Sequence, residues 1–151
     1  MFNKILVAID GSKFAQKGLE SALEIAKYSE EAEIHLIQVV DNTVINPIVD
    51  LSHIHAANAM ENEMLHILSD EADKSLEKVK EFVLETLPDV NVTTHLEFGR
   101  PAGCICACAD EYDVDVVIIG SKGLRGVERL LMGSVAAEVI TYTTKNVLVI
   151  K

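Results

Sequence analysis

The chain has 151 residues, 49% of them hydrophobic, and a formal net charge of −11 at pH 7. This length allows one well-filled core and is too short for two ordinary domains, so we expect a single domain over residues 1–151. The acidic surface repels DNA, RNA and anionic lipid, and the apolar runs fall short of the roughly 20 residues that cross a bilayer. The amino terminus also lacks the layout of a signal peptide. We therefore expect a cytoplasmic protein that binds neither nucleic acid nor membrane.

Five short segments rich in β-branched residues alternate with four segments of helical spacing. We expect strands over residues 5–9, 34–40, 92–98, 114–119 and 147–150. We expect helices over residues 14–28, about 56–87, 101–112 and 134–142. This alternation predicts an α/β fold, an open parallel five-stranded sheet with helices on both faces. The predicted strand order is 3-2-1-4-5, a Rossmann-like arrangement in which the winding reverses between strands 1 and 4.

Asp10 stands at the end of the first expected strand, where the predicted strand order places a crevice. Ligands of open α/β sheets bind at the carboxyl ends of the strands, at the point where the winding reverses. The loops that follow Ile9 and Ile119 should therefore face each other, which makes Asp10 and Gly120 neighbours. The alternative role for Asp10 is a cap of the helix that follows it.

The connection at about 42–58 is a variable loop that is longer than most and contains several apolar residues. A lid or binding loop and a short additional helix explain it about equally well. In the long helix that follows, apolar residues recur at steps of three and four, which predicts one stripe facing the core and needs no cofactor. The stripe comprises Met60, Met64, Ile67, Leu68, Ala72, Leu76, Val79 and Val83.

Neither the histidines nor the cysteines predict a metal site. His66 follows Glu63 in a Glu-x-x-His step, but the step lies on an acidic face and has no second copy. Cys104, Cys106 and Cys108 fall in an expected helix, where the middle residue points away from the other two. The three thiols therefore cannot converge on one metal ion, and we interpret them as small apolar fillers of a cytosolic helix.

Residues 120–135 carry the strongest functional signal in the chain. Glycines at 120, 123, 126 and 133 follow the apolar end of the fourth expected strand, and Ser134 follows the last of them. Glycine lets main-chain amides approach a ligand closely, and a helix that begins near Ser134 adds unpaired amides and the positive end of its dipole. Lys122, Arg125 and Arg129 add local positive charge within an acidic chain. The segment therefore predicts a phosphate-binding loop, although it is neither a Walker A loop nor a GxGxxG fingerprint.

The spacing within this segment is Gly120, two residues, Gly123, nine residues, and then Gly133-Ser134. This pattern resembles the ATP-binding signature of the universal stress protein family. The resemblance covers almost the whole chain, because four further segments look like the family's opening strand, second strand, link into the third helix and last strand. These are residues 4–12, 35–41, 99–102 and 146–150. Residues 143–146 depart from the Cys-Pro-Val that the family usually has before its last strand.

The resemblance implies ATP and Mg²⁺ as cofactors and a role for each site residue. It implies that Asp10 contacts the nucleoside, with the option of holding a metal through water, and that the main chain of Val39 meets the adenine edge. It implies phosphate contacts from Gly120, Gly123, Gly133, Ser134 and Val135. Ser134 has the alternative role of a helix cap. The predicted cofactor-binding set also includes Ser121, Lys122 and Arg125, with the two cations as further phosphate partners.

Two functions remain open: an ATP-binding regulatory protein of the stress response, and a dimeric interaction module of the same fold that binds no nucleotide. Members of the family are known on both sides, and the intact glycine spacing favours ATP. A phosphoacceptor receiver is excluded because its aspartate would end strand 3, where this chain has Glu97-Phe-Gly99. The sequence shows no catalytic pair near the site, neither a nucleophile with a base nor two carboxylates. We therefore expect at most slow ATP hydrolysis.

The last expected strand predicts a homodimer. Val147 to Ile150 carries no charge, proline or glycine, and it lies at one edge of the expected sheet. We expect no helix to cover this edge, because the chain ends at Lys151. A bare edge of this kind templates pairing with another chain, and antiparallel pairing about a twofold axis closes both edges at once. The family resemblance implies the same arrangement.

Overall fold

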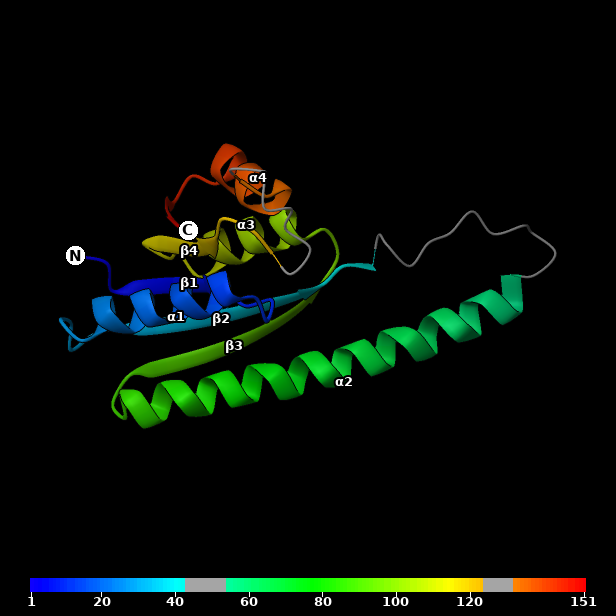
Figure 1. Cartoon of the computed structure of the whole chain (residues 1–151), viewed down its shortest axis with the longest axis horizontal. Helices are drawn as coiled ribbons and strands as arrows, with labels where there is room; N and C mark the ends of the chain where they lie inside the picture. Colours follow the sequence, from blue (N-terminus) through cyan, green and yellow to red (C-terminus); the bar gives the residue numbers. More distant parts are fainter. Residues whose placement is uncertain (43–53, 124–131) are drawn as a thin grey trace.

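The structure is a computed structural model that describes residues 1–42, 54–123 and 132–151, with side chains in the long helix described from residue 59 onward. Five parallel strands form one sheet in the order β3-β2-β1-β4-β5, as the sequence predicted (Figure 1). The strands are β1 (Lys4–Ala8), β2 (Glu33–Val40), β3 (Asn91–Phe98), β4 (Val116–Gly120) and β5 (Asn146–Ile150). The helices are α1 (Lys13–Ala26), α2 (Ile54–Thr86), α3 (Pro101–Glu111) and α4 (Ser134–Tyr142).

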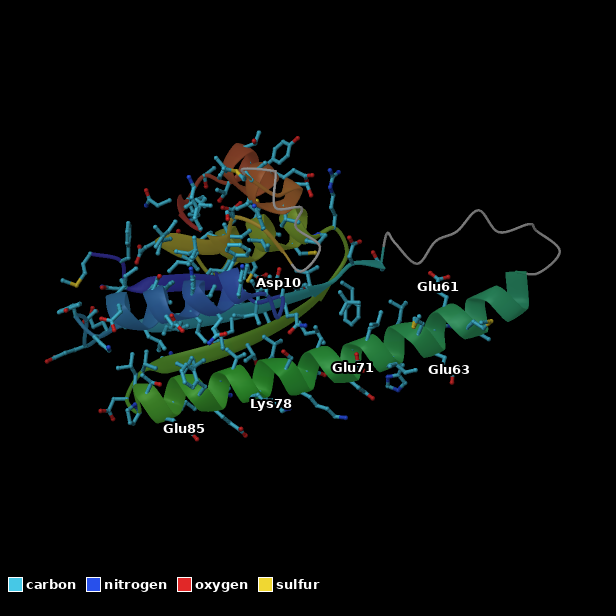
Figure 2. The ribbon with its side chains drawn as sticks, in the orientation of Figure 1. Asp10, Glu61, Glu63, Glu71, Lys78 and Glu85 are labelled. Atoms are coloured by element: carbon cyan, nitrogen blue, oxygen red, sulfur yellow. The ribbon has the colours of Figure 1, made fainter. Side chains whose placement is uncertain are left out.

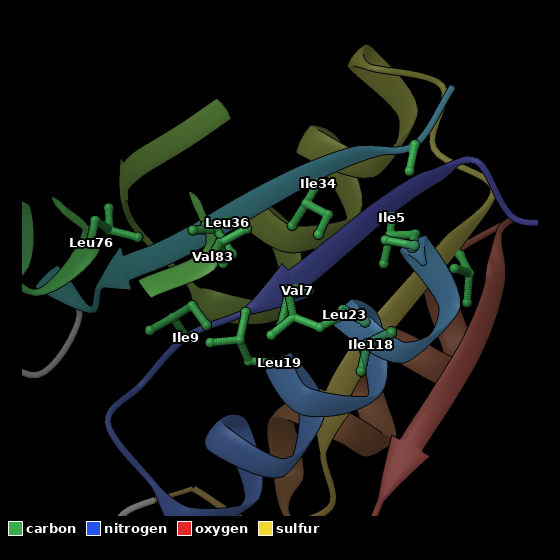
Figure 3. Packing of buried hydrophobic residues seen from close by; sticks show 14 residues of the cluster. Ile5, Val7, Ile9, Leu19, Leu23, Ile34, Leu36, Leu76, Val83 and Ile118 are labelled. Atoms are coloured by element: carbon green, nitrogen blue, oxygen red, sulfur yellow. The ribbon is translucent and has the colours of Figure 1, made fainter. Parts of the chain in front are cut away.

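The two faces of the sheet each have their own hydrophobic core. Successive residues of a strand point to opposite faces, so Ile5 and Val7 of β1 join the core under α1 and α2, whereas Leu6 joins the core under α3 and α4. All three side chains are fully buried. This is why β1 and β4 carry runs of consecutive apolar residues rather than apolar residues at alternate positions. Figure 3 shows the first core, which includes Leu19, Leu23, Ile34, Leu36, Leu76, Val83 and Ile118.

Helix α2 begins and ends close to its predicted limits, but the prediction of one continuous core stripe along it is wrong. Ala72 and Val83 are buried, whereas Met60, Met64 and Ile67 are exposed. One reason is length: the amino-terminal half of α2 extends beyond the end of the sheet (Figure 1), so nothing in the sheet can cover it. The other is direction, because Met60, Met64 and Ile67 lie on another side of the helix from Ala72. Among the described residues, no helix is both long and apolar enough to cross a membrane.

A polar cluster lies within the core on the α3 side of the sheet. His35 Nδ1 of β2 lies 3.0 Å from His95 Nε2 of β3, and both side chains are buried. The Tyr112 ring centroid lies 5.1 Å from that of His35 and 4.5 Å from that of His95. Burial lowers the pKa of both imidazoles, and the neighbouring His95 lowers that of His35 further. The pair is therefore neutral at pH 7, with one ring donating and the other accepting.

The three cysteines are free and belong to α3. Cys108 is buried in the second core, which confirms its interpretation as an apolar filler, and Cys104 and Cys106 are half-buried. Burial raises the pKa of all three thiols, that of Cys108 to about 12. A thiol with a raised pKa carries little thiolate at neutral pH, so these side chains are poor nucleophiles.

Candidate functional site

Two loops from distant parts of the chain meet at the carboxyl end of the sheet. β1 and β4 are parallel neighbours, so the residues that follow Ala8 and Gly120 lie on the same side. A Cβ atom built on Gly123 would lie 3.0 Å from Asp10 Oδ2, which brings this main chain directly against the carboxylate. Figure 2 shows Asp10 at this end of the sheet. The meeting of the two loops follows from the reversal of winding between β1 and β4.

The carboxylate of Asp10 is held by the turn that leads into α1. The Ser12 amide donates to Asp10 Oδ1 at 2.9 Å, and Gly11 between them has a φ of 78°, which glycine adopts without strain. Ser12 is the N-cap of α1, because its Oγ accepts the Ala15 amide at 3.1 Å. The alternative role of Asp10 as the helix cap is therefore wrong. Asp10 shapes the turn through one oxygen and directs the other toward Gly123.

Helix α4 begins beside the same loop. The Gly133 amide donates to the Ser121 carbonyl at 2.6 Å, which joins the start of the helix to the segment after β4. Gly133 is the N-cap and Ser134 the first helical residue, so the prediction that a helix begins near Ser134 is confirmed and its alternative role as the cap is wrong. Gly133 has no side chain with which to cap this helix, and no other residue in the described ranges supplies a side-chain cap. Its first amides and the positive end of its dipole are therefore directed toward the loop without a side-chain acceptor.

Two residues of the predicted site are used by the fold itself. A Cβ atom on Gly120 would lie 2.7 Å from Phe14 Cβ, so the absence of a side chain lets α1 pack closely on the end of β4. Ser121 is buried, its amide donates to the Ile150 carbonyl at 2.7 Å, and its carbonyl accepts from Gly133. The main chain of Ser121 therefore ties β5 and α4 together. Sequence spacing alone does not separate such residues from those left for a ligand.

The remaining predicted site residues take up different positions. Lys122 lies between Ser121 and Gly123 and is half-buried. The last residues that β1 and β2 pair with each other are Ala8 and Ile37. Val39 lies two residues further along β2, so its main chain runs beside the loop that contains Asp10. Val39 and Val135 also pack against the second core. Arg125 lies outside the described residues.

The structure adds Arg100, which the sequence analysis did not single out. It stands at the N-cap of α3, and its Nη2 lies 3.0 Å from Oε1 of Glu138, one turn after Ser134 in α4. The hydrogen bond with Glu138 raises the pKa of the guanidinium, and Asp41 contributes in the same direction. A permanent cation, paired with Glu138, therefore lies beside α4 one helical turn from its first residue. Only the packing of α3 on α4 reveals this position, because 34 residues separate Arg100 from Ser134.

Comparison with known proteins places this arrangement in a family. The model of the Universal stress protein family matches residues 1–151. The chain is 32% identical to universal stress protein YxiE of Bacillus subtilis, with 100% of each chain covered. The solved structure of the hypothetical protein MJ0577 has a TM-score of 0.87 and 28% identity, with 100% of this chain and 96% of that chain covered.

A further solved structure, the universal stress protein from Archaeoglobus fulgidus in complex with dAMP, has a TM-score of 0.65. Its identity is 21%, with 100% of this chain and 98% of that chain covered, and it shows a common fold. The family model and a relative above 30% identity both extend along the whole chain. The chain belongs to the universal stress protein family.

Proposed function

We propose that this protein binds ATP with Mg²⁺ in the crevice between the loops after β1 and β4, as a regulatory nucleotide-binding protein of the stress response. The observation that carries the proposal is the start of α4, where Gly133 caps the helix without a side-chain hydrogen bond. A nucleotide phosphate satisfies such amides and is attracted by the positive end of the helix dipole. The dAMP complex of the Archaeoglobus fulgidus protein supports a nucleotide as the ligand of this fold.

The two sides of the crevice suit the two parts of a nucleotide. On the β4 side, Gly123 and the first turn of α4 offer main-chain amides to the phosphates, and Arg100 adds a cation beside that turn. On the β1 side, Asp10 Oδ2 offers a hydrogen-bond acceptor to the ribose hydroxyls. Val39 offers a main-chain edge to the base. Lys122 and Arg125 are proposed as further phosphate contacts.

The residues at this site fit a magnesium ion that is held mainly by the phosphates. Among the described residues, no group of three His, Cys, Asp or Glu side chains could hold a metal ion. Mg²⁺ commonly binds through substrate phosphates, waters and one or two carboxylates. Asp10 would supply the protein's contact, through a bound water. The ion would offset the negative charge of the triphosphate. Any hydrolysis would be slow, because no pair of nucleophile and base is evident in the sequence near the site.

We also propose that the protein forms a homodimer through β5. In the described sheet β5 pairs with β4 on one side only, and Leu148 at its centre is 37% exposed. Antiparallel pairing of two such edges about a twofold axis would satisfy the outward amides and carbonyls of both chains. The free thiols of Cys104 and Cys106 suit a reducing compartment, so we further propose a cytoplasmic location.

The decisive experiment replaces one amide at the start of α4. Proline is favoured at the first helical position, so Ser134→Pro should leave α4 intact while it removes the amide and the hydroxyl of Ser134. The matched control, Ser134→Ala, removes the hydroxyl alone. We expect Ser134→Pro to lose about 1.5–3 kcal/mol of ATP affinity in calorimetric titration, the range for a hydrogen bond to a charged group, and Ser134→Ala to lose less. Equal ATP affinity in a folded Ser134→Pro protein would contradict the proposed phosphate site.

A second pair of variants separates the two roles of Asp10. Asp10→Asn keeps an oxygen that can accept the Ser12 amide and removes the negative charge, whereas Asp10→Ala removes both. If Asp10 contacts the nucleotide, both variants should bind ATP more weakly, and only Asp10→Ala should also lower the melting temperature. A wild-type dimer that binds no ATP would instead support the alternative function, an interaction module without nucleotide.

A further inference from the structure

The amino-terminal half of α2 has no cover from the rest of the described chain. Between residue 59 and residue 71 no side chain is buried, and Ala72 is the first that is. Figures 1 and 2 show this half of the helix extending past the end of the sheet, with Glu61 and Glu63 well away from the strands. A helix that projects in this way normally carries polar residues on every face.

This half of α2 instead has two apolar tracks. One continues the buried face of Ala72 toward the amino terminus through Leu68 and Leu65, which are half-buried. The other consists of Met60, Met64 and Ile67, which are 73%, 52% and 51% exposed, and we call it the methionine stripe. At roughly 100° per residue the methionine stripe lies about 110° around the helix from Ala72. It is therefore not part of the face that packs on the sheet.

Acidic side chains surround the methionine stripe. Residues 59–73 contain no lysine or arginine, and they contain Glu61, Glu63, Asp70, Glu71 and Asp73. Glu71 follows Ile67 by four residues and ends the stripe, while Glu63 and Asp70 flank it on one side at helical spacing. The surface thus combines a narrow apolar row with a border of carboxylates, Glu63, Asp70 and Glu71, which we call the acidic margin.

The charge argues against a second copy of this chain as the occupant of the stripe. Antiparallel pairing of two projecting segments would bring acidic margin against acidic margin, between molecules that each carry a formal charge of −11. The proposed dimer contact does not cover the stripe either. β5 is at one edge of the sheet and β3, on which α2 packs, is at the other.

We propose that the methionine stripe docks a basic amphipathic helix of a partner protein. Residues at steps of four and three on one helix match the apolar row of another helix, which packs against it side by side. Lysine or arginine beside that row would meet the acidic margin and supply complementary charge. Methionine side chains are flexible and polarizable, and they adapt to different apolar partners. This surface is separate from the nucleotide crevice, so the inference does not depend on ATP binding.

The test uses the full-length protein and a fluorescent peptide of leucine and lysine with helical amphipathic spacing. Fluorescence anisotropy should show saturable binding that weakens as salt is added. The double variant Met60→Gln/Met64→Gln keeps good helix formers and removes two apolar contacts, so its Kd should rise about tenfold or more. Phe82→Gln is the matched control, because Phe82 is an exposed apolar residue of the same helix outside the stripe, and its Kd should stay within about twofold.

Two further measurements guard against unspecific attraction and self-association. A peptide of the same composition but scrambled order should bind at least about tenfold more weakly if the apolar row is recognised. Glu63→Gln/Glu71→Gln should reduce the salt dependence of amphipathic-peptide binding. Equal binding of the two peptides, equal binding of wild type and Met60→Gln/Met64→Gln, or no wild-type binding would each overturn the proposal. Light scattering that reports self-association lost in Met60→Gln/Met64→Gln would assign the stripe to a second copy and overturn it as well.

Discussion

Single residues at the carboxyl end of the sheet serve either the fold or a ligand, and their hydrogen bonds separate the two groups. Ser121 uses both main-chain groups to connect β5 with α4, and Gly120 makes room for Phe14. Asp10 uses only Oδ1 in its turn, and Ser134 begins a helix whose N-cap, Gly133, has no side chain. Substitutions in the first group should therefore change stability, and those in the second should change affinity.

Gly120→Ala should destabilise the protein, because the new methyl carbon would lie 2.7 Å from Phe14 Cβ and α1 would have to move. Overpacking of this kind costs about 1–3 kcal/mol. Gly103→Ala is the matched control, since Gly103 lies within α3 with nothing within 4 Å of an added Cβ atom. Alanine should stabilise that position by about 0.5–1 kcal/mol. Urea unfolding measures both changes, and shifts of the same sign would contradict the assigned packing role of Gly120.

Helices α1 and α4 both begin at the carboxyl end of the sheet, but their first turns are satisfied differently. Ser12 caps α1 with its hydroxyl, which accepts the Ala15 amide, so one amide of that turn is already paired. Gly133 caps α4 with no side chain. We therefore expect an anion to gain more at α4 than at α1, because fewer of the α4 amides have a side-chain acceptor among the described residues.

The edge strand β5 allows a direct test of the proposed homodimer. The Ile150 carbonyl accepts the Ser121 amide beside β4, so alternation directs the main-chain groups of Val149 to the free edge. Val149→Pro should remove an outward amide, leave the β4 pairing in place and weaken the dimer. Val149→Thr keeps the amide and the β-branched shape and should remain dimeric. Light scattering measures the molecular masses of the wild type and both variants, and so their oligomeric states. A wild type that stays monomeric at high concentration, or an unaffected Val149→Pro dimer, would contradict the contact.

Across the described residues, the molecule combines two apolar cores with a buried pair of imidazoles. His35 and His95 occupy the core on the α3 side, where burial lowers both pKa values. In the unfolded chain each imidazole returns to a pKa of about 6.5. Just below this pH the unfolded chain binds more protons than the folded protein, so the free energy of unfolding falls as the pH falls.

The contribution of this pair to the free energy of unfolding should therefore be fully present above about pH 6.5. It should decline as the solution becomes more acidic. Glu33 near His35 and Glu97 near His95 raise the respective pKa values and partly oppose the effect of burial. Urea unfolding between about pH 7.5 and 5.5 avoids most titration of ordinary carboxyl groups. Over this range the wild type should lose more stability than His35→Gln/His95→Gln. Equal losses in the two proteins would show that the pKa values of the pair do not differ between the folded and the unfolded state.

The sequence by itself determined the order of elements, the parallel sheet and its reversal of winding, because buried strands and amphipathic helices leave local patterns of β-branched and apolar residues. It also located the end of the sheet at which the loops that follow Ile9 and Ile119 should face each other. The family resemblance, carried by the glycine spacing, was likewise legible from sequence alone. The elements and the glycine spacing depend on residues close to one another in the chain, whereas the strand order and the meeting of the two loops followed from general rules for open α/β sheets.

Only the tertiary structure decided which residues serve the fold and which are left open to a ligand or partner. Gly120 and Gly123 look alike in sequence, yet one lies against Phe14 and the other against Asp10. Met60 and Ala72 belong to one run of three- and four-residue steps in the sequence, yet Met60 is exposed. It lies on another side of the helix from Ala72 and in the half of α2 that extends past the sheet. Local periodicity records what a residue is suited to contact, whereas burial depends on which distant segment is present to make the contact.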